Sequence, residues 1–112
     1  MKVLLKVLSG PDSGKQFSSA QADKVTVGRG QACQIQLTDP SVSRTHFEIS
    51  YEQGHFLLTD LGSAGGVLIN GGKADEKRLR HGDRIQVGKT EISVALVGGP
   101  EDDTYDSSSQ NR

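Results

Sequence analysis

The chain has 112 residues, of which 33% are hydrophobic and none is Trp, and its formal net charge is −1. This length predicts one domain with a modest core, and the near-neutral charge excludes strong whole-molecule attraction to nucleic acid. Cys33 is the single cysteine, which excludes an internal disulfide and favours a reducing compartment. No apolar run approaches the roughly 20 residues that cross a bilayer, so we expect a cytoplasmic protein without a membrane or nucleic-acid partner.

Short apolar runs with a period of two cover the first half of the chain. Residues 3–8 predict a first strand, Phe17 begins a second, and residues 25–27 form a third. The same alternation returns at residues 35–37 and 47–51. Clusters of turn-forming residues separate these runs, so we expect each run to be a strand of its own.

The second half of the chain continues this pattern with closely spaced turns. Asn70-Gly71 is a strong hairpin signal, because both central positions of a type I′ turn need a positive φ. The glycine-rich run at 62–66 predicts a longer loop. Further strands are expected at residues 55–60, 67–69, 84–87 and 91–96, and Leu79 precedes a tight turn at 81–83.

The fold class follows from what these runs share. No window of 11 or more residues has helical periodicity with caps, and turn signals recur about every 8–12 residues. We therefore predict an all-β fold over residues 1–97, a β-sandwich of two antiparallel sheets with about 11 short strands. Residues 98–112 contain four acidic residues, one arginine and many serines, and predict a disordered tail.

Two of the loops hold the residue types of an oxyanion site. Arg29 stands between two glycines after the third run, and Ser43-Arg44 follows the Asp39-Pro40 turn. A guanidinium group is a rigid fork of donors, which hydroxyl and backbone N–H groups can complete around an anion. In a sandwich the loops at one end supply the site, so these two loops and the loop at 62–66 need only share an end to converge.

With these loops placed, the sequence resembles a forkhead-associated (FHA) domain, a β-sandwich that binds phosphothreonine peptides. The resemblance covers roughly residues 1–97 and implies that Arg29 and Ser43 contact the phosphate while Arg44 lines the same groove. The matching residues are Gly28-Arg29, Ile35, Leu37, 42–46, 60–63, Gly66, Asn70-Gly71, Gly82-Asp83 and Gly88. Phosphopeptide contacts are expected from Arg29, Ser43, Arg44, Ala64, Gly65 and Asn70, and structural support for the binding loops from Gly28, His46, Ser63 and Gly66.

The third loop departs from the family pattern. The family has Ser-x-Asn-Gly-Thr here, and its Asn bonds the backbone of the bound peptide, whereas this chain has Gly65 in place of the Asn and Val67 in place of the Thr. A lost hydrogen bond to a neutral partner is worth about 0.5–1.5 kcal/mol. The substitution therefore predicts peptide binding that is weaker by up to about tenfold.

Enzyme interpretations find little support in the sequence. Gly28 and Gly30 begin like a dinucleotide fingerprint, but the third glycine is missing and no helix follows. Ser43 and His46 lack the G-x-S-x-G elbow of a hydrolase, Cys33 suits a small buried position, and the three histidines have no metal-ligand spacing. We expect no catalysis, no cofactor and no metal.

The prediction is a phosphothreonine-dependent peptide-binding adaptor in Ser/Thr-kinase signalling, whose partner is a phosphothreonine-containing protein or peptide. The alternative is a degenerate FHA-like scaffold that binds proteins without phosphorylation or associates with itself. Thr104 adds a hypothesis: in its acidic run it suits an acid-directed kinase and, once phosphorylated, could bind Arg29 in cis. An inert solubilising tail is the favoured interpretation, as is a solvated loop for the basic run Lys73, Lys77, Arg78 and Arg80.

Overall fold

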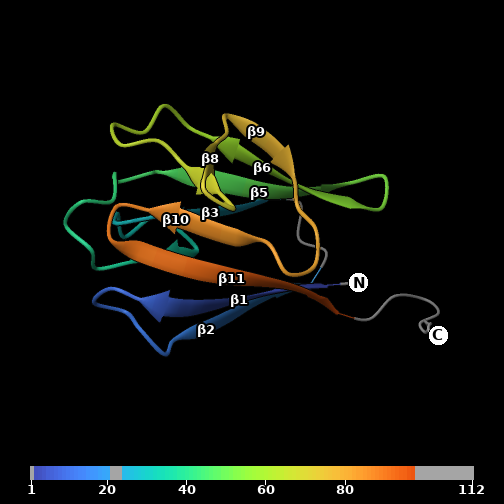
Figure 1. Ribbon diagram of the computed structural model, residues 1–112, viewed down its shortest axis with the longest axis horizontal. Helices are drawn as coiled ribbons and strands as arrows, with labels where there is room; N and C mark the ends of the chain where they lie inside the picture. The colour runs from blue at the N-terminus through green and yellow to red at the C-terminus, as the bar shows by residue number, and fades with distance from the viewer. Residues whose placement is uncertain (1, 21–23, 98–112) are drawn as a thin grey trace.

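A computed structural model describes residues 2–20 and 24–97, which form two sheets packed face to face (Figure 1). The described residues contain eleven strands and no helix, and so no helix that could cross a membrane. The six-stranded sheet has the order β2 (Gln16–Ala20), β1 (Lys2–Ser9), β11 (Thr90–Val97), β10 (Arg84–Val87), β7 (Leu68–Ile69) and β8 (Gly72–Lys73). The five-stranded sheet has the order β4 (Ile35–Gln36), β3 (Lys24–Gly28), β5 (Phe47–Glu52), β6 (His55–Asp60) and β9 (Glu76–Arg78).

The predicted all-β sandwich is confirmed, with differences of detail. The β3–β4 pair is parallel, with Val27 opposite Ile35, because the loop between them returns the chain to lie beside the last two residues of β3 in the same direction. The short strands β8 and β9 have no apolar alternation and were not visible in the sequence. Leu79 lies just after β9 and is buried, and its N–H still donates to the carbonyl of Phe56. The predicted disordered tail lies outside the described residues.

The core forms where the alternating apolar residues of the two sheets meet. On β1, Val3, Leu5 and Val7 are buried while Lys2 and Lys6 are exposed, as a period of two requires. The largest fully buried side chains come from both sheets and include Phe47, Leu58, Ile85 and Ile92. Burying each such side chain stabilises the fold by about 1.5–3 kcal/mol, so these strands are a rigid base for the loops.

Three loops lie at one end of the sandwich (Figure 1). The first loop follows β3 and contains Arg29, the second follows β4 and contains Ser43, and the third follows β6 and contains Gly65. The β10–β11 turn is at the same end, since a Cβ placed on Gly88 would run into the side chain of Ser41. The described chain leaves β11 at the opposite end, near the β5–β6 turn (Figure 1). The sandwich therefore brings the three loops of the predicted site together.

Asn70 and Gly71 form the predicted two-residue hairpin turn. Their φ angles are 53° and 85°, and Ile69 pairs with Gly72 across the turn. The two positive φ values are those that a type I′ turn needs. The sequence signal therefore identified both the position and the conformation of this turn.

Two buried carboxylates tie the loop at 38–46 to distant turns. Asp39 accepts hydrogen bonds from the N–H and hydroxyl of Ser41, from the Lys89 N–H at 2.9 Å, and from the Thr90 hydroxyl at 2.8 Å. Asp12 accepts from the N–H of Thr38 at 2.7 Å and from its hydroxyl at 3.0 Å. The loop is therefore anchored to both the β10–β11 turn and the β1–β2 turn.

Asp39 makes the stability of the fold depend on acid pH. Burial raises the pKa of its carboxyl, but hydrogen bonds from Ser41, Thr90 and the Lys89 N–H outweigh burial and lower the pKa from 3.8 to about 2. A lowered pKa stabilises the fold above pH 4, and this contribution of about 2 kcal/mol is lost as the pH falls from about 4 to about 2.

Replacing Asp39 with Asn is expected to lower the free energy of unfolding by about 2 kcal/mol at pH 7, because the charge-assisted bonds are lost. The variant should also lose less stability than the wild type between pH 4 and pH 2.5. Urea unfolding at several pH values measures both effects. Asp75→Asn, at an exposed site, is the control. The same acid dependence in Asp39→Asn and wild type would contradict this role.

Candidate functional site

Arg29 follows the end of β3, and most of its guanidinium N–H donors form no hydrogen bond among the described residues. Its Nε donates to the carbonyl of Val42 at 3.0 Å, and its backbone N–H donates to the carbonyl of Ser43 at 3.0 Å. A guanidinium group has five N–H donors, and among the described residues only the Nε of Arg29 has a partner. No carboxylate of the described residues forms an ion pair with it. The side chain is exposed, so it is an oriented cation available to an external anion.

Gly28 allows the two loops to approach each other closely. A Cβ at this position would overlap the carbonyl group of Arg44, whose carbon would be 2.8 Å away, and would lie 2.9 Å from the Ser43 oxygen. Backbone atoms cannot move aside as a flexible side chain can. The contact supports the structural role that was expected for Gly28.

Ser43 belongs to the second loop and contacts the third. Its hydroxyl oxygen accepts a hydrogen bond from the Ala64 N–H at 3.1 Å, and its own N–H donates to Nδ1 of His46 at 3.0 Å. Its hydroxyl proton is free to donate, because this hydroxyl acts only as an acceptor among the described residues. Ser43 is half-buried, and it brings the second and third loops into contact.

His46 is fully buried and joins the same loops from below. Because its Nδ1 accepts from a backbone N–H, the ring proton is on Nε2, which donates to the carbonyl of Gly66 at 2.8 Å. Its backbone N–H donates to the carbonyl of Val27, and its carbonyl accepts from the N–H of Leu61. One residue thus connects β3, the loop that contains Ser43 and the loop at 62–66.

The third loop is closed by its own side chains. Asp60 accepts from the Ser63 N–H at 2.9 Å, and the Ser63 hydroxyl accepts from the Gly66 N–H at 2.9 Å. Gly65 is exposed, has no positive φ, and has no atom within 4 Å of where a Cβ would be. The backbone at position 65 therefore has room for the side chain that this sequence lacks.

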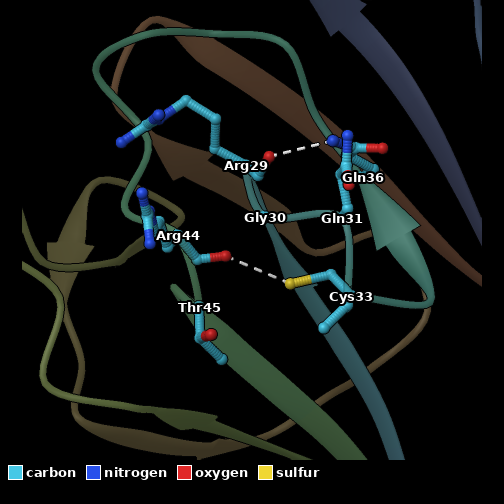
Figure 2. Close-up of a pocket in the computed structure, with 8 residues that line it drawn as sticks. Arg29, Gly30, Gln31, Cys33, Gln36, Arg44 and Thr45 are labelled. Carbon is cyan, nitrogen blue, oxygen red and sulfur yellow. Dashed lines mark hydrogen bonds between the residues drawn. The ribbon is translucent and has the colours of Figure 1, made fainter.

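Arg44 adds a second guanidinium group beside Arg29. Its carbonyl accepts from the Gly30 N–H at 2.9 Å and from the thiol of the buried Cys33 at 3.1 Å. In Figure 2 the side chains of Arg29 and Arg44 leave the loops on the same side. These loops border a concave pocket of about 500 Å³. Its lining residues are Arg29, Gly30, Gln31, Ala32, Cys33, Gln36, Arg44 and Thr45.

The three loops present a group of hydrogen-bond donors that could hold an anion, and the comparisons with known proteins identify the family of this fold. The FHA domain family matches residues 25–88, which include all three loops. The chain belongs to the FHA domain family. This family consists of binding modules rather than enzymes, and the match confirms the resemblance that was drawn from the sequence.

Individual relatives extend the match beyond these loops. The chain is 38% identical over 101 residues to the glycogen accumulation regulator GarA of Mycolicibacterium smegmatis, covering 90% of this chain and 63% of the regulator. It is 36% identical over 97 residues to the oxoglutarate dehydrogenase inhibitor of Corynebacterium efficiens, covering 87% of this chain and 66% of the inhibitor. The chain thus spans slightly less than two thirds of each relative's length.

A solved FHA structure has the same fold. It was determined in work on phosphothreonine-dependent FHA domain interactions, and it superposes on this chain with a TM-score of 0.79 and 34% identity. The superposition covers 88% of this chain and 99% of that one.

The FHA resemblance implies that Asn70 braces loops and lies near the peptide, and its side chain makes two hydrogen bonds within the described residues. Its side-chain amide donates to Asp83 at 2.9 Å, and its side-chain oxygen accepts from the Arg84 N–H at 2.9 Å. These bonds fasten the β7–β8 turn to β10, which is a bracing role. A contact of Asn70 with bound peptide stays a prediction.

Two features of the FHA site were missed in the sequence. The sequence indicated turns at Asp12 and at Asp39, but it did not indicate that these carboxylates anchor the second loop. Lys73 was assigned to a solvated run, but its Cε is 3.4 Å from where a Cβ of Gly66 would be, so the lysine flanks the third loop. No group of three His, Cys, Asp or Glu in the described part of the chain is placed to hold a metal.

Proposed function

We propose that this FHA domain is a phosphothreonine-dependent adaptor that acts in cytoplasmic Ser/Thr-kinase signalling and catalyses no reaction. The observation that carries the proposal is Arg29, whose outer guanidinium nitrogens are unpaired among the described residues, beside the Ser43 hydroxyl. The solved relative studied for phosphothreonine-dependent interactions supports the same ligand. The curated relatives, a regulator and an inhibitor, support a regulatory role.

The chemistry of these loops suits a phosphate monoester. A phosphorylated threonine carries nearly two negative charges and three strong acceptors. Arg29 offers a fork of donors, Ser43 offers a hydroxyl, and the N–H of Arg44 forms no hydrogen bond among the described residues. Such charge-assisted bonds are roughly twice as strong as bonds between neutral groups. An unphosphorylated threonine would leave these donors without an anion.

The direct test is a calorimetric titration with three peptides of one sequence, carrying phosphothreonine, threonine or phosphoserine. We expect the phosphothreonine peptide to bind at least about 100-fold more tightly than the threonine peptide, since at least 2.7 kcal/mol of charge-assisted contact is lost. The phosphoserine peptide separates recognition of the phosphate from recognition of the threonine methyl group. Equal binding of all three peptides would reject the proposal and favour the phospho-independent scaffold.

Replacing Gly65 with Asn is expected to raise phosphopeptide affinity by up to about tenfold, because a side-chain amide can again bond the peptide backbone. The open space around position 65 accepts the side chain without strain. Titrations of wild type, Gly65→Asn and Gly65→Ala measure the effect. The Ala variant stiffens the loop without adding an amide, so an equal gain in both variants, or no gain with Asn, would contradict the hydrogen-bond explanation.

A further inference from the structure

A second concave site lies at the end of the sandwich opposite the phosphate loops. This pocket has a volume of about 290 Å³ and includes residues of the β5–β6 turn, β6, β9, the β9–β10 connection and the end of β11. Phe56, Leu79 and Leu96 contribute apolar surface to it. Its polar lining consists of Arg78, Arg80, His55 and His81. We call it the distal pocket.

The distal pocket is lined by donors and contains no carboxylate. Arg78 lies 3.4 Å from Nε2 of His55, and because a guanidinium group can only donate, that ring nitrogen accepts. Nδ1 of His81 accepts from the Leu96 N–H at 3.1 Å. Each ring therefore keeps its proton on the other nitrogen. The only ion pairs among the described residues are Lys15–Asp12 and Arg84–Glu91, so neither Arg78 nor Arg80 has a carboxylate partner there.

Such a lining fits an anionic peptide segment that also carries an apolar side chain. Two arginines supply charge that is not neutralised locally, and the apolar residues give a surface for an aromatic ring or an aliphatic stem. The sequence that follows the last strand has this composition. It contains Glu101, Asp102, Asp103, Tyr105 and Asp106.

The geometry of the chain favours this pocket over the phosphate loops as the partner of that segment. The described chain leaves β11 at Val97, next to Leu96 of the pocket lining. The phosphate loops lie beyond the other end of β11, an eight-residue strand about 25 Å long. Thr104, seven residues after Val97, reaches at most about 25 Å. Its predicted contact with Arg29 in cis concerns a residue outside the described ones and would need a fully extended connection.

We propose that the distal pocket binds the acidic segment 101–106 of the same chain through Arg78 and Arg80. A connection of this length gives an effective concentration in the millimolar range. A contact with a dissociation constant of about 1 mM is then about half occupied without any partner protein. The pocket is a second binding site, independent of phosphopeptide binding.

The test compares amide NMR spectra of the full chain with those of a variant whose segment is neutral (E101Q, D102N, D103N and D106N). At low salt, about 20 mM, we expect the amide chemical shifts of Gly54, His55 and Leu96 to differ between the two proteins. About 0.5 M NaCl should abolish the difference, because exposed charges are then screened. The amide of Gly30, in the loop after β3 at the other end of the sandwich, should not change.

A second pair of variants assigns the effect to the pocket. In a chain carrying R78E and R80E, neutralising the acidic segment should no longer move these amides. K6E and K89E change the net charge equally but lie outside the pocket lining, so this double variant should keep the full effect. The proposal would be overturned if the pocket amides had the same chemical shifts in the wild type and the neutral-segment variant at low salt. Shifts that grow with protein concentration from about 0.05 to 0.5 mM would overturn binding within one chain.

Discussion

Replacing Arg29 with Ala is expected to weaken phosphothreonine-peptide binding by more than about 100-fold. A hydrogen bond to a charged group contributes about 1.5–3 kcal/mol, and Arg29 has two outer nitrogens free to bond the phosphate. The free energy of unfolding should fall by only about 1 kcal/mol, since the one side-chain bond lost from the fold is that to the carbonyl of Val42. Calorimetric titration measures the affinity, and urea unfolding measures the stability.

The controls separate a phosphate contact from a general effect of charge. Arg84→Ala removes an exposed arginine of β10 that pairs with Glu91 of β11, and it should leave the affinity nearly unchanged. Arg44→Ala keeps the backbone N–H and should cost only a few-fold, since the exposed side chain adds mainly long-range attraction. Affinity that is unchanged in Arg29→Ala, or equally reduced in Arg84→Ala, would refute the assigned role of Arg29.

The strands could be predicted from sequence because their side chains obey one rule. Alternation along residues 3–8, 25–27 and 84–87 marked the inward positions, and the structure buries those positions. Gly72–Lys73 has no apolar side chain to bury, so β8 depends on the turn before it and not on its own sequence. The parallel β3–β4 pair depends on the path of the Arg29 loop, which a local pattern does not encode.

The site was predictable only as far as short motifs reach. Arg29, Ser43 and His46 could be proposed from the sequence because they stand in ordered, closely spaced motifs. The bonds that hold their loops connect distant positions: Asp39 to Lys89, and Asp12 to Thr38. Partners separated by 26 to 50 positions in sequence leave no local periodicity.

The basic run shows the same limit in another way. Its four basic residues lie within positions 73–80, but the fold divides them between the two ends of the sandwich. Lys73 lies beside Gly66 of the third loop, whereas Arg78 and Arg80 line the distal pocket. One charged segment therefore supplies cations to two separate surfaces, which its composition alone could not indicate.

Rigid loops are as important to this site as the groups that touch the ligand. A binding surface that is ordered before the ligand arrives loses less entropy on binding. Asp39 holds the second loop to the β10–β11 turn, and His46 holds it to β3 and to the third loop. Of the two, His46 has the more central position, because both of its ring nitrogens bond backbone groups of the binding loops.

Replacing His46 with Ala is therefore expected to lower the free energy of unfolding by about 3–4 kcal/mol. The change leaves a cavity in place of a fully buried ring. It also leaves the Ser43 N–H and the Gly66 carbonyl without their partner, and each unpaired buried group costs about 1–3 kcal/mol. Urea unfolding measures the loss, and His55→Ala, at an exposed site, should change stability by less than about 0.5 kcal/mol.

Phosphopeptide affinity gives a second measure that does not depend on global unfolding. At about 10 °C, with the variant still folded, we expect binding at least about tenfold weaker than wild type, because Ser43 and the third loop are no longer fixed relative to Arg29. Amide spectra should show the change concentrated at residues 43, 61 and 66, where the bonds of His46 end. If the variant unfolds less readily than expected and binds as tightly as the wild type, then the loops are ordered by Asp39 and the strands alone, and His46 is only a core residue.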